Sequence, residues 1–453
     1  MNFTENLTYK KIFLFWGPLA LTWLMMSIEQ PFLVAVIARL GDAKNNLAAF
    51  GIAFSFALII EAPVIMLMSA STALVGDSNS LKKMKRFTDL LNASVTIVQL
   101  LILIPPVFSF IIQDLMEVPE DVARITYYSL ILLLPWPAAI GYRRFYQGIL
   151  IRNNLTRRVT YGTLVRLSAI VITGFFLYKT GMKGAYVGSL TLSVAVMLEA
   201  VASWVMARKT VASLQAGQAN AGNAFDMNNP GEPLRYRFIA RFYFPLALTS
   251  LLSLGVNPFV TFFMGRSQLP IESLAVLPAI NGLVFIFRSM GLSFQEVNIA
   301  LIGARKQNYR KLRNFAIFLG TAVTVLLAVI AFTPLARLWF ENISGLTYDL
   351  SEMAYLPVRL MLLLPALSVL LSFQRSTLVV AGRTRPISVA TAVELIVIVA
   401  VLLASIVWFD MVGVIAATIA YVIGKTVSNI YLGPINFGVV RKWQRADRKE
   451  IVR

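Results

Sequence analysis

Charged side chains interrupt several long apolar stretches of this 453-residue chain. Glu29, Glu61 and Arg166 lie in the first half of the sequence, and Arg288 and Glu394 lie in the second half. A charged group at the centre of a bilayer costs at least ~2.5–3.5 kcal/mol on insertion scales, so each of these residues is a candidate functional group. A carboxylate in such a place can bind Na⁺ or carry a proton, whereas a planar guanidinium suits carboxylates and phosphates. The residues therefore predict ion-coupled chemistry on a charged solute.

The composition indicates that these groups lie inside a membrane. Hydrophobic residues make up 58% of the chain and charged residues 14%, whereas soluble domains have roughly 45–50% and ~25%. The chain contains no Cys and no His, which excludes thiolate nucleophiles, imidazole proton relays and the usual zinc or haem ligands. We also find no G-x-x-x-x-G-K-[ST] loop for ATP. We therefore expect no enzyme and no bound cofactor, with Na⁺ or H⁺ as a coupling ion.

Long apolar runs predict an all-α polytopic membrane protein, because a helix needs ~20 apolar residues to cross a bilayer. A Gly/Asn/Ala-rich stretch, "LQAGQANAGNAFDMNNPGEP", divides the runs into two sets of six and reads as a linker. The predicted domains are an N-terminal six-helix lobe (1–206), a cytoplasmic linker (207–235), a C-terminal six-helix lobe (236–440) and a basic cytoplasmic tail (441–453). The twelve predicted spans are 11–38, 46–75, 87–112, 122–149, 158–180, 183–206, 236–263, 271–301, 313–340, 351–380, 386–408 and 411–437.

The distribution of basic residues predicts how the chain is oriented in the membrane. Basic residues concentrate in the loops after the even-numbered spans and in the tail, whereas the loop after the third span is acidic. The positive-inside rule then places both termini in the cytoplasm, and we expect a bacterial inner membrane. This distribution explains the net charge of +19 without nucleic acid as a partner. The tail "RKWQRADRKEIVR" suits anionic lipid headgroups, and we expect a monomer with a small-molecule substrate.

The chain repeats itself at a nearly constant distance. The octapeptide "FWGPLALT" begins at Phe15, and "FYFPLALT" begins at Phe242, which is 227 residues later (242 − 15). A shift of 228 places Pro137 on Pro365. An even number of spans separates the two copies, so both halves enter the membrane in the same direction. This arrangement predicts two bundles related by a pseudo-twofold axis along the membrane normal, with the substrate between them and alternating access by rocking.

Two pairs of equivalent positions carry opposite charges. The 227 shift places Glu61 on Arg288, and the 228 shift places Arg166 on Glu394. We interpret these positions as two layers that face each other across the axis. One reading makes the pairs inter-lobe salt bridges, and the other makes the arginines a site for an anionic substrate. Because Arg166 and Glu394 lie about two turns, or ~12 Å, from the cytoplasmic end, we assign them to a cytoplasmic gate.

Polar residues at positions 281, 288 and 295 recur every seven residues, which places them roughly on one helical face. Such a polar stripe normally lines protein or water rather than lipid, so we expect it to form one wall of a cavity. The predicted ion-coupling residues are Glu29, Gln30 and Glu61, because Pro31 loosens the backbone beside the first two. The predicted substrate-binding residues are Arg288, Asn281, Gln295, Glu61, Asn257 and Arg359.

The duplicated twelve-span architecture resembles the multidrug/oligosaccharidyl-lipid/polysaccharide (MOP) flippase superfamily, which includes the MATE exporters. The N-terminal text "GPLALTWLMMSIEQPFLVAVIARL", followed by "LAAFGIAFSFALI", resembles the progressive ankylosis (ANK) family. The MATE resemblance implies export of organic cations, and the ANK resemblance implies export of small anions such as pyrophosphate, citrate and nucleotides. The seventh span carries Asn257 rather than an acid, which departs from a typical MATE and favours the anion.

We therefore predict a secondary exporter of a small anionic organic solute, coupled to H⁺ or Na⁺. Two alternatives stay open at this point. One is a flippase of lipid-linked oligosaccharides or polysaccharides, and the other is a cationic multidrug exporter. Both belong to the same superfamily.

Overall fold

The regular elements in the described part of the chain are helices, apart from one isolated bridge between Gln268 and Val412. The computed structural model describes residues 7–153, 155–216, 235–302, 308–381, 383 and 385–451. Eleven helices there are long and apolar enough to cross a membrane. The helix pair Ser78–Ile102 and Pro105–Leu115 bends by 74°, and it brings the number of candidate spans to twelve when the pair is counted as one span. The prediction of a polytopic helical membrane protein is confirmed.

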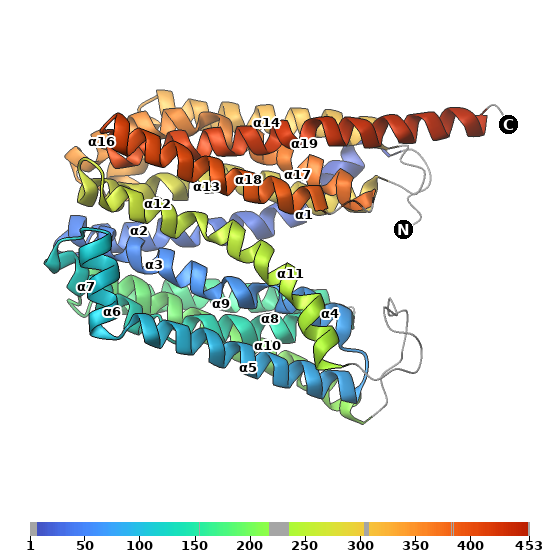
Figure 1. Cartoon of the computed structure of the whole chain (residues 1–453), viewed down its shortest axis with the longest axis horizontal. Helices are drawn as coiled ribbons and strands as arrows, with labels where there is room; N and C mark the ends of the chain where they lie inside the picture. Colours follow the sequence, from blue (N-terminus) through green and yellow to red (C-terminus); the bar gives the residue numbers. More distant parts are fainter. Residues whose placement is uncertain are drawn as a thin grey trace. The chain divides into compact units, whose positions relative to one another are not determined.

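Two compact units make up the fold. The N unit comprises Val36–Gly265, and the C unit comprises Met1–Ala35 together with Arg266–Arg453. The helices of the N unit are α3 (Ala43–Ile65), α4 (Leu67–Leu74), α5 (Ser78–Ile102), α6 (Pro105–Ser109), the π-helix η1 (Phe110–Leu115), α7 (Glu120–Leu132), α8 (Trp136–Arg152), α9 (Thr156–Tyr178), α10 (Gly184–Gln215), α11 (Tyr236–Leu254) and α12 (Val256–Gly265). Within this unit α10 packs against α8 and α9 (Figure 1).

The C unit is built in the same way from the second half of the chain, with α19 packed along α17 and α18 (Figure 1). Its elements are α1 (Tyr9–Ser27), α2 (Glu29–Ala38, whose last turn belongs to the N unit), α13 (Pro270–Leu301), α14 (Tyr309–Phe332), α15 (Leu335–Arg337), the π-helix η2 (Leu338–Ile343), α16 (Tyr348–Leu360), the 3₁₀-helix η3 (Met361–Leu363), α17 (Leu364–Val380), α18 (Arg385–Leu403), the π-helix η4 (Ala404–Trp408) and α19 (Gly413–Ile451).

The first helix of each half of the sequence belongs to the unit that is built mainly from the other half: α1 belongs to the C unit, and α11 belongs to the N unit. The Trp16 indole N–H on α1 donates to Ser293 Oγ at 2.8 Å, which ties α1 to α13 in the C unit. In the N unit, the Thr261 hydroxyl on α12 donates to Ser55 Oγ at 2.8 Å. The lobe boundaries predicted from sequence, 1–206 and 236–440, describe the repeat and stay a prediction.

Irregular backbone recurs at equivalent positions and makes the internal repeat visible. Ile28 separates α1 from α2 and Gly255 separates α11 from α12, and 28 + 227 = 255. Each break precedes a proline by three residues, Pro31 and Pro258, which is where the missing N–H and the ring disturb a helix. The π-helices 110–115 and 338–343 are related by 228. The duplication read from the octapeptides therefore extends to local backbone geometry.

Several ends differ from the predicted ranges. α5 begins at Ser78 instead of 87 because Asp77 caps it, with the Ser80 N–H donating to Asp77 Oδ1 at 2.6 Å. α10 continues to Gln215, past the predicted start of the linker at 207. Most of the predicted linker lies outside the described residues. The backbone of the predicted tail (441–453) continues α19 as far as Ile451.

Candidate functional site: two buried ionic clusters

Glu199 on α10 is the centre of a buried ionic cluster in the N unit. The side chain is 1% exposed. Arg143 Nη1 donates to its Oε2 at 2.5 Å, and Gln147 Nε2 donates to its Oε1 at 3.2 Å. Arg143 and Gln147 are four residues apart on α8 and so share one helical face. Arg166 Nη1 on α9 lies 3.7 Å from the same Oε2. Three helices thus converge on one carboxylate.

Glu61 on α3 extends this cluster. The Trp136 indole N–H donates to Glu61 Oε2, and Glu61 interacts electrostatically with Arg143, Arg144 and Arg166. The Arg166 guanidinium lies 5.9 Å from the centre of the Trp136 ring, within the range of a cation–π interaction. We call this set the N cluster; its charged members are Glu61, Arg143, Arg144, Arg166 and Glu199. With every group ionised, three arginines against two carboxylates leave a charge of +1.

A second cluster lies in the C unit, between α13, α17, α18 and α19. Lys425 on α19 forms an ion pair with Glu394 on α18. Arg288 Nε on α13 donates to Ser368 Oγ at 3.1 Å. Both Arg288 and Arg375 on α17 interact electrostatically with Glu394. We call this set the C cluster; its charged members are Arg288, Arg375, Glu394 and Lys425. Three cations against one carboxylate leave a charge of +2.

Neutral polar groups surround the C cluster. Arg375 Nη2 donates to Thr391 Oγ1 at 3.1 Å, and its buried Nε has no hydrogen-bond partner among the residues that the structure describes. Asn281 on α13 is hydrogen-bonded to Tyr421 on α19, and Tyr421 interacts electrostatically with Arg288. The structure thus brings two predicted substrate residues, Asn281 and Arg288, into one site with the predicted gate residue Glu394. This site combines surplus positive charge with hydrogen-bond donors and acceptors.

The charge reversal between the two halves has a local explanation. In the N unit Glu61 interacts with Arg166, and in the C unit the equivalent positions are Arg288 and Glu394, which interact in the same way. Between the two units both charges of the pair are reversed together, so each unit keeps one acidic and one basic residue that attract each other. The partners that we observe come from each group's own unit. Ion pairs between Glu61 and Arg288, or between Arg166 and Glu394, stay a prediction.

The other predicted residues lie outside these contacts. Arg359 is exposed, and its Nε donates to the Ala331 carbonyl at 3.2 Å, at the end of α14. Asn257 is half-buried on α12, where its amide reaches the Leu254 carbonyl of the preceding turn at 3.5 Å. The remaining three residues are Gln295, half-buried on α13, and Glu29 and Gln30, which begin α2 as a buried and a half-buried residue.

Sequence reasoning missed several charged members of the clusters. Arg143 falls inside the predicted span 122–149 but was not selected as a site residue, and it is 5% exposed inside α8. Glu199 and Lys425 were not selected as site residues, and each forms an ion pair in a cluster. Arg375 was overlooked, although the 228 shift places it on Gln147 of the N cluster (147 + 228 = 375). Applying the repeat to every polar residue in the spans would have found it.

The fold defines the class of this protein as a polytopic helical membrane protein. A structure described as the inward-facing conformation of a multidrug resistance MATE family transporter of the MOP superfamily is similar over 94% of this chain and 96% of its own, with a TM-score of 0.71 and 14% identity. Residues 18–176 match the MatE family model. The chain thus has the fold of the MATE transporters in the MOP superfamily, as its architecture predicted.

Two further structures share this fold. The lipid II flippase MurJ, in an inward closed conformation, has a TM-score of 0.69 at 14% identity and covers 92% of this chain and 86% of its own. A MOP superfamily transporter from Pyrococcus furiosus, in which the reverse polarity of the binding pocket suggests a different function, has a TM-score of 0.58 at 16% identity and covers 97% of this chain and 100% of its own. No curated protein matches the sequence significantly.

Proposed function

We propose that this protein is a secondary active transporter that moves a small anionic organic solute across the membrane by alternating access. The observation that carries the proposal is the charge of the C cluster, where Arg288, Arg375 and Lys425 share the single carboxylate of Glu394. Uncompensated charge inside a membrane is costly, and such residues mark substrate and ion pathways. A bound anion would neutralise the surplus positive charge and accept hydrogen bonds from the N–H groups of each guanidinium.

The N cluster suits a coupling role better than a substrate role. Glu199 already accepts hydrogen bonds from Arg143 and Gln147, whereas the hydrogen bond that Glu61 accepts comes from the neutral indole of Trp136. A carboxylate without a directly bonded cation changes its protonation more easily than one held by arginine. We therefore propose H⁺ coupling through Glu61, with Na⁺ as the alternative ion and Glu29 and Gln30 as a second candidate position.

The cellular setting is proposed from the loop charges. Both termini would lie in the cytoplasm of a bacterium, with the protein in the inner membrane as a monomer that exports its solute. The basic end of α19 would contact anionic headgroups rather than nucleic acid. In the Pyrococcus furiosus transporter of the MOP superfamily, the reverse polarity of the binding pocket suggests a different function. A cationic C cluster fits such a change.

Solute flux into proteoliposomes tests the proposal. The purified chain is assayed with citrate, pyrophosphate, a nucleotide and an organic cation, each under an imposed H⁺ or Na⁺ gradient. We expect flux of at least one anion, and a fall of about 10-fold or more for Arg288→Gln, because a hydrogen bond to a charged group contributes about 1.5–3 kcal/mol. The matched control is Arg337→Gln, since Arg337 lies outside the spans with its side chain 66% exposed.

Three outcomes would contradict the proposal. Flux of the organic cation alone would support a cationic multidrug exporter instead. Equal anion flux for Arg288→Gln and Arg337→Gln would remove the C cluster from the solute pathway. A flippase would instead transfer a lipid-linked pyrophosphate between leaflets without moving any of the soluble anions. Thermal unfolding of each variant shows that a loss of flux is not a loss of fold.

A further inference from the structure

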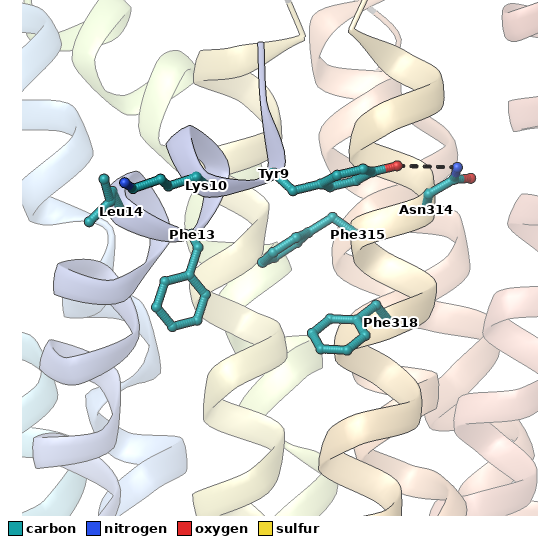
Figure 2. A pocket seen from close by; sticks show the side chains of 7 residues that line it. All are labelled: Tyr9, Lys10, Phe13, Leu14, Asn314, Phe315 and Phe318. Carbon is teal, nitrogen blue, oxygen red and sulfur yellow. Dashed lines mark hydrogen bonds between the residues drawn. The ribbon is translucent and has the colours of Figure 1, made fainter.

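An apolar groove lies in the C unit between α1 and α14. Its volume is ≈ 670 Å³, and aromatic rings from both helices line it (Figure 2). Phe13 and Leu14 project from α1, and Phe315 and Phe318 project from α14. Phe318 is 66% exposed, so the groove is not filled by the unit's own side chains. In a membrane, an open apolar groove of this kind is a place for a hydrocarbon chain.

The groove extends over slightly more than one turn of each helix. Its lining runs from Tyr9 to Leu14 on α1 and from Asn314 to Phe318 on α14. These five and four residue steps (14 − 9 and 318 − 314) rise by about 7.5 Å and about 6 Å, which is close to half of one leaflet of the ~30 Å hydrocarbon core. An acyl chain that enters beside Tyr9 would therefore lie along the rings for about half of its leaflet.

The polar end of the groove carries positive charge. Lys10 lines the groove itself, and Lys311 on α14 donates to the Leu7 carbonyl at 2.8 Å, which joins the starts of the two helices. Neither α1 nor α14 has an acidic residue in its first turn. Among the described residues, no carboxylate forms an ion pair with Lys10. The neighbouring basic residues Lys11, Arg310 and Arg313 add to the field.

We propose that this groove binds an anionic phospholipid, with one acyl chain against Phe13, Phe315 and Phe318 and the headgroup phosphate at Lys10. The apolar wall supplies affinity for any lipid, and the basic rim selects a negative headgroup. Near a membrane surface each Lys or Arg contributes about 1 kcal/mol to such an attraction. Tyr9 and Asn314, whose side chains are joined at 3.5 Å, supply neutral donors at the same level (Figure 2). The site is independent of the proposed solute.

Lipid retention by the intact protein tests this site. The full chain is placed in nanodiscs of phosphatidylcholine with one-fifth phosphatidylglycerol, extracted into mild detergent and analysed by native mass spectrometry. We expect wild type to retain phosphatidylglycerol in preference to phosphatidylcholine. Lys10→Gln should lower that preference by about fivefold, the ratio that corresponds to about 1 kcal/mol. The matched control is Lys82→Gln, since Lys82 is also an exposed lysine near the start of a helix, α5.

A second pair of variants tests the apolar wall. Phe318→Ala should reduce retention of both lipids, whereas Phe244→Ala should leave retention unchanged, because Phe244 is equally exposed at 69% but lies outside the groove. The proposal is overturned if wild type retains both lipids equally, or if Lys10→Gln behaves as Lys82→Gln does. Retention that is unaffected by Phe318→Ala would likewise show that the lipid binds elsewhere.

Discussion

Replacing Glu199 by Gln is expected to destabilise the N unit by about 3–5 kcal/mol. This is the usual cost of removing one partner of a buried ion pair, because the other charge stays buried without compensation. The magnitude follows from the contacts: Glu199 is 1% exposed, accepts from Arg143 at 2.5 Å and lies 3.7 Å from Arg166. Glutamine keeps the shape of the side chain, so the change isolates the charge. Two arginines lose their nearest carboxylate.

Thermal unfolding in detergent, followed by tryptophan fluorescence, measures this effect. The N unit has 230 residues (265 − 36 + 1), and a domain of that size shifts its melting temperature by about 2–4 °C per kcal/mol. The expected decrease is therefore about 6–20 °C. The matched control is Asp121→Asn, which breaks an ion pair with Arg124 whose side chains are 60% and 80% exposed. Exposed pairs of this kind contribute only about 0–1 kcal/mol.

A double-mutant cycle then separates the ion pair from general packing. Adding Arg143→Met to Glu199→Gln removes the closest uncompensated charge, so the double variant should be more stable than the sum of the two single effects predicts. Coupling between residues in contact is about 0.5–3 kcal/mol, and we expect a value near the upper end. Strict additivity, or a Glu199→Gln protein that melts with wild type, would refute the reasoning that places these charges in one buried cluster.

Three further predictions concern the packing at a glycine, the pH dependence of stability and the exchange of two paired charges. Gly148→Ala should lower the free energy of unfolding by about 1–3 kcal/mol in equilibrium unfolding, because the new Cβ would lie 2.5 Å from a backbone carbonyl of α4. The control is Gly438→Ala, since Gly438 is an exposed helical residue with open space at its Cβ and should tolerate alanine. The hydrogen bond from the Ser80 backbone N–H lowers the pKa of Asp77 below 3.8. The stability that this hydrogen bond contributes is present above that pH and should be lost as acid protonates the carboxylate in the folded protein. Asp77→Asn should lack this acid-dependent loss when unfolding is measured as a function of pH. The exchange Glu61→Arg with Arg166→Glu should restore stability that either single change removes, and a double variant no better than the singles would disprove the local pairing.

Much of the fold was predictable because its determinants are local. An apolar run of ~20 residues is sufficient to identify a spanning helix, and the prolines at 31 and 258 mark breaks that the structure places at Ile28 and Gly255. The same local reasoning finds the duplication, because equivalent residues keep a nearly constant spacing. Helix ends were less predictable, since capping at Asp77 extends α5 beyond its apolar run.

The site was only partly predictable because its contacts are long-range. Arg288 and Glu394 are recognisable as charged residues within apolar segments of the sequence, and the structure brings them into one cluster. Arg143, by contrast, lies near the end of the predicted span 122–149, close to the basic residues of the following loop. Its burial depends on α10 packing beside α8, which joins Arg143 to a carboxylate 56 residues away. No spacing rule in the sequence encodes that contact.

The most direct test of the central claim compares two double variants in the proteoliposome anion assay. Glu394→Gln with Lys425→Met removes the ion pair between Lys425 and Glu394 in the C cluster and leaves its two arginines, so anion flux should persist at a measurable rate. Arg288→Gln with Arg375→Gln keeps the ion pair and removes the surplus charge, so anion flux should fall to the level of empty liposomes. Anion flux that survives the loss of both arginines in a folded protein would contradict the account.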